Sequence, residues 1–204
     1  MFSSGDTNWT DPGLSVRFFD DKISVGSSGN VVIGVTSSAT FTSTSTWYHI
    51  VLAVDSTQAT SSNRVKIFVG GSQITALSSA IYPSQNYDFG INNTSYQTNV
   101  GTEIDTGTLS YYLDGYLSEV HFIDGQFLTP AAFAETNSAT GVWSPKAYSG
   151  TYGTNGFFLN FSDNSASTAA AIGKDFSGNG NNLTPTNISL VAGVTYDSTT
   201  DVPP

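Results

Sequence analysis

Short apolar runs that alternate with polar residues and end at Gly, Asp or Ser recur along the chain. The clearest pair covers residues 48–55 and 64–70, and another strong run covers residues 116–123. All three are rich in β-branched and aromatic residues, a composition typical of strands that are joined by turns. The pattern therefore predicts a protein built from short antiparallel strands.

The pair at residues 48–55 and 64–70 is predicted to form a hairpin with a long polar connection. Because side chains alternate between the two faces of a strand, each strand should have one apolar face. In the first strand this face carries Ile50, Leu52 and Val54, and in the second it carries Val65, Ile67 and Val69.

Weaker patterns predict further strands and one short helix. A helix is expected near 130–135, since Thr129 is a suitable cap, Pro130 suits the first helical position and Phe133 would pack back. The expected strand pairs are 14–19 with 22–25, turning at Asp20-Asp21, and 30–35 with 39–42. Single strands are expected around residues 87–91, 100–104 and 156–161.

Composition excludes several classes of partner and site. The 204 residues carry a net charge of −10 with only six Lys and Arg, so a nucleic acid or an anionic membrane is a poor partner. The chain has no cysteine, which excludes disulfides and thiolate metal sites. No apolar run is long enough to span a bilayer as a helix.

Two segments resemble a known family. Trp47-x-His49 precedes an apolar strand, and Asp114-Gly115-Tyr116-Leu117-Ser118-Glu119-Val120 opens another. Together they resemble the laminin-G-like, concanavalin A-like domains of marine bacteriophage virion proteins. The resemblance implies an all-β fold, an antiparallel jelly-roll β-sandwich.

The same resemblance implies a function and a location. It predicts a non-enzymatic structural or adhesive module of a bacteriophage particle, in a capsid decoration or a tail fibre, at the virion surface or otherwise extracellular. The implied partners are other virion proteins, copies of the chain itself, and a cell-surface glycan. The alternative is a calcium-assisted carbohydrate-binding module of a larger protein.

The order of the segments leaves the domain organisation open. We expect residues 1–155 to form the sandwich and residues 192–204 to be an extended tail. Residues 156–191 are expected to complete the same sandwich by folding back. The alternative is that they open a second, truncated unit, because a strand followed by Asp175-x-Ser177-Gly178-Asn179 resembles the beginning of such a domain.

The sequence offers no catalytic set. Glycosidases need two carboxylates about 5 to 10 Å apart across a cleft, whereas Glu119 is the only acid on its face of the 116–123 run. The two histidines, His49 and His121, do not have the spacing of a zinc site. We therefore expect a protein that is not an enzyme.

Two candidate binding sites remain. Oxygen side chains at alternate positions suit calcium, although they also build ordinary turns without metal; the candidate ligands are Asp175, Asn179 and Asn181. Aromatic rings can stack on sugars, although we expect most of these rings to pack over the ends of the sandwich, because large aromatics dominate small cores. The candidate carbohydrate-binding residues are Trp9, Tyr111, Tyr112, Tyr148 and Tyr152.

Overall fold

The computed structural model describes residues 1–5, 13–27, 31–105, 108–193 and 196–199. Within these residues the chain is nearly all β with antiparallel sheets, which confirms the predicted fold class at that level. The contacts divide the chain into two compact units. Unit 1 comprises Met1–Tyr116 and Phe127–Glu135, and unit 2 comprises Leu117–Gln126 and Thr136–Pro204.

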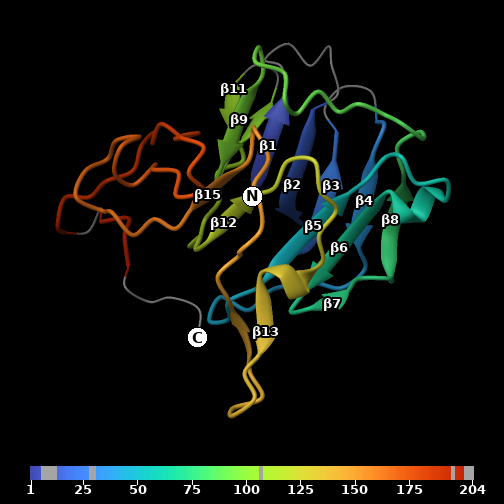
Figure 1. Cartoon of the computed structure of the whole chain (residues 1–204), viewed down its shortest axis with the longest axis horizontal. Coiled ribbons are helices and arrows are strands. Elements are labelled where there is room, and N and C mark those ends of the chain that lie inside the picture. The colour runs from blue at the N-terminus through green and yellow to red at the C-terminus, as the bar shows by residue number, and fades with distance from the viewer. Residues whose placement is uncertain (6–12, 28–30, 106–107, 194–195, 200–204) are drawn as a thin grey trace. The chain divides into compact units, whose positions relative to one another are not determined.

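Unit 1 contains a six-stranded antiparallel sheet in the order β8-β4-β3-β2-β1-β9 (Figure 1). Its strands are Phe2–Gly5 (β1), Leu14–Phe19 (β2), Lys22–Gly26 (β3), Gly34–Ser37 (β4), Leu77–Ile81 (β8) and Gln97–Val100 (β9). The predicted hairpin at residues 14–25 is confirmed as β2 and β3, with Phe19 opposite Lys22.

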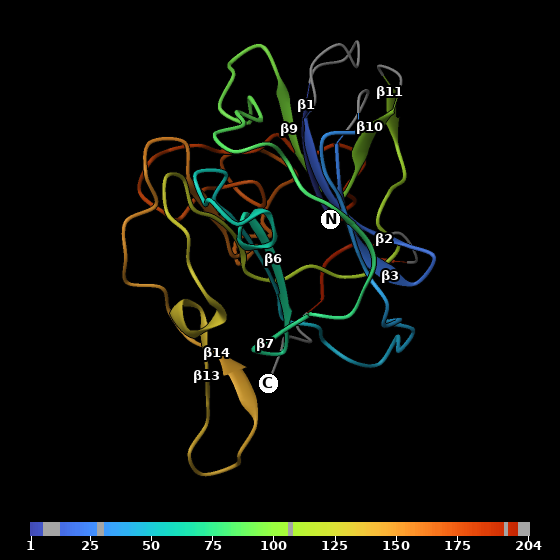
Figure 2. The ribbon, with the colours of Figure 1, turned by 90° about the vertical axis from the view of Figure 1, so that its right-hand side faces the viewer.

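A second sheet of unit 1 has the order β5-β6-β7. Its strands are Ile50–Val54 (β5), Val65–Val69 (β6) and Ser72–Gln73 (β7), and a 3-10 turn at Ser61–Asn63 (η1) lies between β5 and β6. The predicted long-loop hairpin is therefore confirmed. Two more strands, Glu103–Asp105 (β10) and Thr108–Ser110 (β11), form a small hairpin that lies next to β1 (Figure 2).

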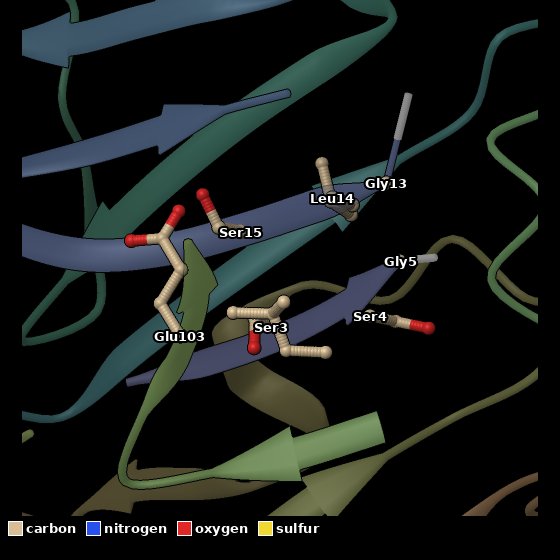
Figure 3. A pocket seen from close by; sticks show the side chains of 8 residues that line it. Ser3, Ser4, Gly5, Gly13, Leu14, Ser15 and Glu103 are labelled. Carbon is tan, nitrogen blue, oxygen red and sulfur yellow. The ribbon is translucent and has the colours of Figure 1, made fainter. Parts of the chain in front are cut away.

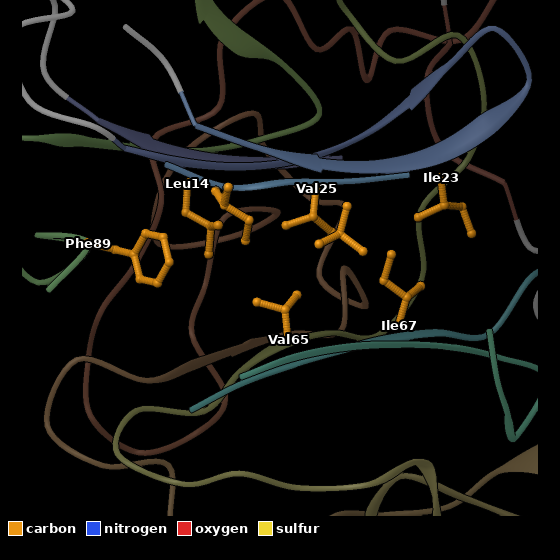
Figure 4. Packing of buried hydrophobic residues seen from close by; sticks show 8 residues of the cluster. Leu14, Ile23, Val25, Val65, Ile67 and Phe89 are labelled. Atoms are coloured by element: carbon orange, nitrogen blue, oxygen red, sulfur yellow. The ribbon is translucent and has the colours of Figure 1, made fainter. Parts of the chain in front are cut away.

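The two sheets of unit 1 face each other across one hydrophobic core. In Figure 4, Leu14, Ile23 and Val25 point from the larger sheet toward Val65 and Ile67 of the smaller one. The predicted apolar faces are confirmed, since Ile50, Leu52, Val54 and Val69 also pack against this core. Burying each such side chain contributes roughly 1.5–3 kcal/mol, so this core is a main source of stability for unit 1.

The opposite face of β5 and β6 is also buried. Val51, Ala53 and Phe68 form a second cluster, against which Phe127 and Phe133 pack. A short helix was expected near 130–135, in the chain segment that covers this face. Only Pro130–Ala132 (η2) are helical there, as a single 3-10 turn. The short helix expected near 130–135 is therefore a 3-10 turn of three residues.

The helical turn does not extend further for a local reason. Pro130 does occupy the first turn, but Thr129 makes no side-chain capping hydrogen bond, and the turn ends at its C-cap, Phe133, whose N–H donates to the carbonyl of Pro130. The next residues, Ala134–Thr136 (β13), pair instead with Trp143–Pro145 (β14) in a two-stranded sheet. Strand pairing and the packing of Phe133 have overridden a weak helical signal.

Unit 2 contains the antiparallel pair Val120–Phe122 (β12) and Phe157–Leu159 (β15), with Val120 opposite Leu159. Both strands were expected, but β12 begins four residues later than residue 116. Glu119 has φ +51°, a left-handed conformation that ends the extended backbone just before Val120. The described residues of the expected strands at 39–42 and 87–91 are not in strands.

Candidate functional site

The Asp175 carboxylate lies at the centre of a loop in unit 2. It accepts hydrogen bonds from the backbone N–H of Phe158 (2.8 Å), of Ser177 (2.8 Å) and of Asn181 (2.9 Å). The Ser177 hydroxyl donates a further bond at 2.8 Å. A buried carboxylate needs such partners, and here the neighbouring turn and strand β15 supply them.

The two asparagines of the predicted metal site fasten this loop to the preceding turn. Asn179 Nδ2 donates to the carbonyl oxygens of Gly153 (2.6 Å) and Gly156 (2.9 Å). Asn181 Nδ2 donates to those of Thr154 (3.1 Å) and Gly156 (2.9 Å). We call residues 175–182 and their bonds to residues 153–158 the Asp175 clamp.

These contacts bear on how the Asp175 clamp could hold a cation. Calcium needs several oxygen ligands, whereas Asp175 faces N–H and O–H donors and both asparagines present their amide nitrogens to the turn. Across the described part of the chain, no group of three or more His, Cys, Asp or Glu is placed to hold a metal ion. The geometry favours the metal-free turn, and a calcium site at Asp175, Asn179 and Asn181 stays a prediction.

The electrostatics of Asp175 follow from the same contacts. Burial raises the pKa of the carboxyl, but the hydrogen bonds from Phe158, Ser177 and Asn181 outweigh burial and hold the pKa below its usual value. Hydrogen bonds to the ionised form favour that form. The clamp is therefore built around a charged carboxylate.

Two of the predicted sugar-binding tyrosines lie together in an aromatic cluster of unit 2. The rings of Tyr148 and Tyr152 meet edge to face, with centroids 5.2 Å apart. His121 stacks on Phe158 at 4.2 Å and its Nδ1 hydrogen-bonds the Tyr152 hydroxyl at 2.9 Å. The rings of Tyr148 and Tyr152 thus contact each other and His121, and a sugar-binding role for them stays a prediction.

The hydroxyl of Tyr152 is held in its neutral form. Burial, followed by the charges of Tyr148, Asp175 and Glu119, raises the pKa of Tyr152 to about 12. The neutral hydroxyl can both donate and accept at His121, which suits a packing contact. The cluster is therefore a half-buried group of packed rings in which a hydrogen bond joins His121 to Tyr152.

The other predicted tyrosines are far more exposed. Tyr111 is 55% exposed and Tyr112 61%, and Tyr116, which the sequence analysis assigned to a strand, is 65% exposed. All three lie in unit 1, after strand β11, beside the exposed Asp114. The predicted site residue Trp9 lies outside the described residues. We call Tyr111, Tyr112 and Tyr116 the exposed tyrosines.

A small pocket in unit 1 contains a buried acid that the sequence analysis did not single out. It lies between β1, β2 and β10 and is lined by serines, glycines, Leu14, Ile104 and Glu103. Figure 3 shows Glu103 beside Ser15 in this pocket. Glu103 Oε2 accepts a 2.7 Å bond from Arg17 Nη1, so its charge is already neutralised by an ion pair. No sequence signal joins two residues so far apart in the chain.

The remaining candidate groups are one acid and two histidines. Glu119 is exposed and has a left-handed backbone conformation just before β12. His49 lies in unit 1, where burial lowers its pKa, whereas His121 lies in the aromatic cluster of unit 2. Glu119 and His121 thus lie in the same part of unit 2, where the charge of Glu119 also acts on Tyr152.

Comparisons with known proteins give no relative. No family model, curated protein or solved structure matches the chain. In the part of the chain that the structure describes, there is no helix with the length and apolar character needed to cross a membrane.

Proposed function

We propose that this protein is a non-enzymatic structural or adhesive module of a bacteriophage particle, in a capsid decoration or a tail fibre at the virion surface. The observation that carries the proposal is the resemblance of residues 47–55 and 114–125 to laminin-G-like virion domains. Two antiparallel sheets packed face to face in unit 1 are compatible with the jelly-roll sandwich that this resemblance implies.

Each of the two resembling segments contains a strand of the structure. Residues 47–55 lead into β5, whose apolar faces pack in two clusters of unit 1. Residues 114–125 contain β12 of unit 2. Both segments thus act in the scaffold, and we place binding on exposed side chains outside them or at their ends.

Labelling of intact particles tests this function. An antibody raised against the chain and coupled to gold should label the surface of intact phage particles at a reproducible position. Labelling that appears only after the particles are broken, or no labelling at all, contradicts a surface module. Boiled and intact particles probed side by side on a membrane provide the control for antibody reactivity.

A glycan contact is the second function that an observation favours. The exposed tyrosines present large aromatic faces in a stretch of six residues that also contains Asp114. Aromatic faces pack on the apolar faces of sugars, while carboxylates accept bonds from sugar hydroxyls. This candidate includes the alternative of a carbohydrate-binding module.

We expect combined Tyr111→Ala, Tyr112→Ala and Tyr116→Ala substitutions to abolish binding on a glycan array without lowering the melting temperature. The rings are mostly exposed, so their removal costs little packing. Tyr196→Ala removes another exposed tyrosine, in unit 2, and should leave glycan binding unchanged. Binding by the triple variant at the wild-type level would remove these tyrosines as the sugar site.

An enzymatic role has a direct test as well. Glu119 would have to act with a second carboxylate, and the buried Glu103 is already paired with Arg17. We expect no hydrolysis of β-glucans by the protein. Hydrolysis that disappears in Glu119→Gln would overturn the non-enzymatic proposal.

A further inference from the structure

The chain contains two Asn-Gly steps, Asn155-Gly156 and Asn179-Gly180, and both lie in unit 2. At such a step the backbone nitrogen of glycine can attack the side-chain carbonyl carbon of asparagine, because no Cβ obstructs the approach. The reaction needs the backbone around the glycine to rearrange into a five-membered ring. The surroundings of each glycine therefore decide which asparagine reacts.

Gly156 is enclosed. It is buried at the start of β15, and a Cβ placed there would collide with the carbonyl oxygen of Tyr152 and lie 2.8 Å from that of Phe122. Asn155 is held too, since its backbone N–H and its Nδ2 both donate to Asp124 Oδ2, at 3.2 and 3.0 Å. The backbone at this step has no room to rearrange.

Gly180 is open. It is exposed, has φ +78°, and a Cβ built on it would meet no atom within 4 Å. Its carbonyl accepts a bond from Asn182, but its backbone nitrogen donates none within the described residues. Hydrogen bonds hold the backbone N–H and the Nδ2 of both asparagines, so the asparagines do not distinguish the two steps. The difference lies at the glycines, because Gly156 is enclosed and Gly180 is open.

We propose that Asn179 is a site of self-catalysed deamidation that loosens the Asp175 clamp. The Gly180 nitrogen gives up its proton and bonds to Asn179 Cγ, the Cγ–Nδ2 bond breaks, and ammonia leaves with that proton. Water then opens the cyclic imide. Opening at the side-chain carbonyl gives aspartate, and opening at the main-chain carbonyl gives isoaspartate.

Either product removes the contacts that Asn179 now makes. The Nδ2 donor faces the carbonyl oxygens of Gly153 and Gly156, and an aspartate would place a negative oxygen against both acceptors. The new charge would also lie in the loop that holds the buried Asp175 carboxylate. Repulsion and two unsatisfied carbonyls should separate the loop from the 153–158 turn.

Peptide mapping by mass spectrometry tests the modification. The folded protein and a urea-unfolded sample are incubated at mildly alkaline pH, and both Asn-Gly peptides are followed over time. We expect the folded protein to convert Asn179 to aspartate and isoaspartate while Asn155 stays intact, and the unfolded chain to convert both. Equal conversion of Asn155 and Asn179 in the folded protein contradicts the proposal. It is also contradicted if Asn179 stays intact in the folded protein over a time in which the unfolded chain has reacted.

The consequence is tested separately with Asn179→Asp. Hydrogen exchange should show loss of protection across residues 175–183 in this variant, with unit 1 unchanged. Asn93→Asp is the matched control, because it adds the same charge while keeping an oxygen to accept the bond from Ser95 N–H. Native protection at residues 175–183 in Asn179→Asp would show that the modification does not loosen the clamp.

Discussion

Arg64 is a buried cation whose guanidinium is hydrogen-bonded to backbone carbonyl oxygens. Its guanidinium donates to the backbone oxygens of Gln58 (2.8 Å), Ala59 (2.9 Å) and Pro83 (2.7 Å), and the residue is only 9% exposed. The planar fork of arginine spreads its donors over three nitrogens and so reaches three separated carbonyls, whereas lysine presents its three donors from one nitrogen. Arg64 thereby ties the loop between β5 and β6 to the segment after β8.

Arg64→Met should lower the free energy of unfolding by about 2–4 kcal/mol, because three carbonyls lose their partner on burial. Arg64→Lys keeps the charge but should recover only part of the loss. Urea unfolding measures both. Lys66→Met, a change on the neighbouring strand, should cost less; a stability of Arg64→Met equal to that of Lys66→Met would refute this role.

Asp175→Asn should destabilise unit 2 by about 1–3 kcal/mol, since an amide nitrogen replaces one of the oxygens that accept N–H bonds. The pH dependence has a definite sign. The folded pKa of Asp175 is depressed, so its contribution is present above the unfolded pKa of about 4 and is lost as the pH falls through the folded value.

Thermal melts of wild type and Asp175→Asn between pH 2 and 7 measure that contribution. The gap between the two melting temperatures should be constant near neutrality and should shrink below about pH 4. Asp163→Asn is the control, because Asp163 makes a similar bond to Ser165 in an open turn. A gap that does not depend on pH would show that the Asp175 charge is not the cause.

Calcium at the Asp175 clamp is tested by removing metal. Because N–H and O–H donors already satisfy the carboxylate, we expect EDTA and calcium chloride to give the same melting temperature. A lower melting temperature in EDTA, absent in Asp175→Asn, would instead establish the calcium alternative.

At this scale, sequence reasoning identified the composition of the clamp but not its partners. The alternating polar residues of 175–181 predicted either a turn or a metal loop. The choice depends on the N–H of Phe158, 17 residues from Asp175, and on the carbonyl of Gly153, 26 residues from Asn179. The pairing of Arg17 with Glu103 is more distant still, so no local pattern could reveal it.

At the scale of elements, local patterns predicted hairpins well. The pairs β2–β3 and β5–β6 have period-two apolar faces and polar connections, and both form. Strand β4 was expected to pair with residues 39–42, but it pairs with β3 and β8. Strand β8 lies more than 30 residues after the expected partner in the chain. Alternation shows which face of a strand is apolar, whereas it does not identify a distant partner.

The β2–β3 turn allows a test of local backbone strain. Asp20 and Asp21 have φ +48° and +59°, the left-handed conformation of a type I′ turn, where Asn-Gly is preferred. Combined Asp20→Asn and Asp21→Gly should raise stability by about 0.5–1 kcal/mol. Chemical denaturation measures the change, and a decrease in stability would show that these side chains make a contact worth more than the strain.

At the scale of the whole molecule, composition and strand pattern were sufficient to predict an all-β chain. The two-unit division depends on contacts between distant segments, such as residues 127–135 with strands β5 and β6. Strand β15 pairs with β12 inside unit 2. The domain boundaries at residues 155 and 191, and the completion of one sandwich by residues 156–191, stay predictions.

The central claim is that this chain is a built-in part of a phage particle. Quantitative mass spectrometry of gradient-purified particles tests it most directly. We predict that the chain co-purifies with the particles in a fixed ratio to the major coat protein and that high salt does not remove it. Its absence from purified particles, or a ratio that falls with each purification step, would contradict the account.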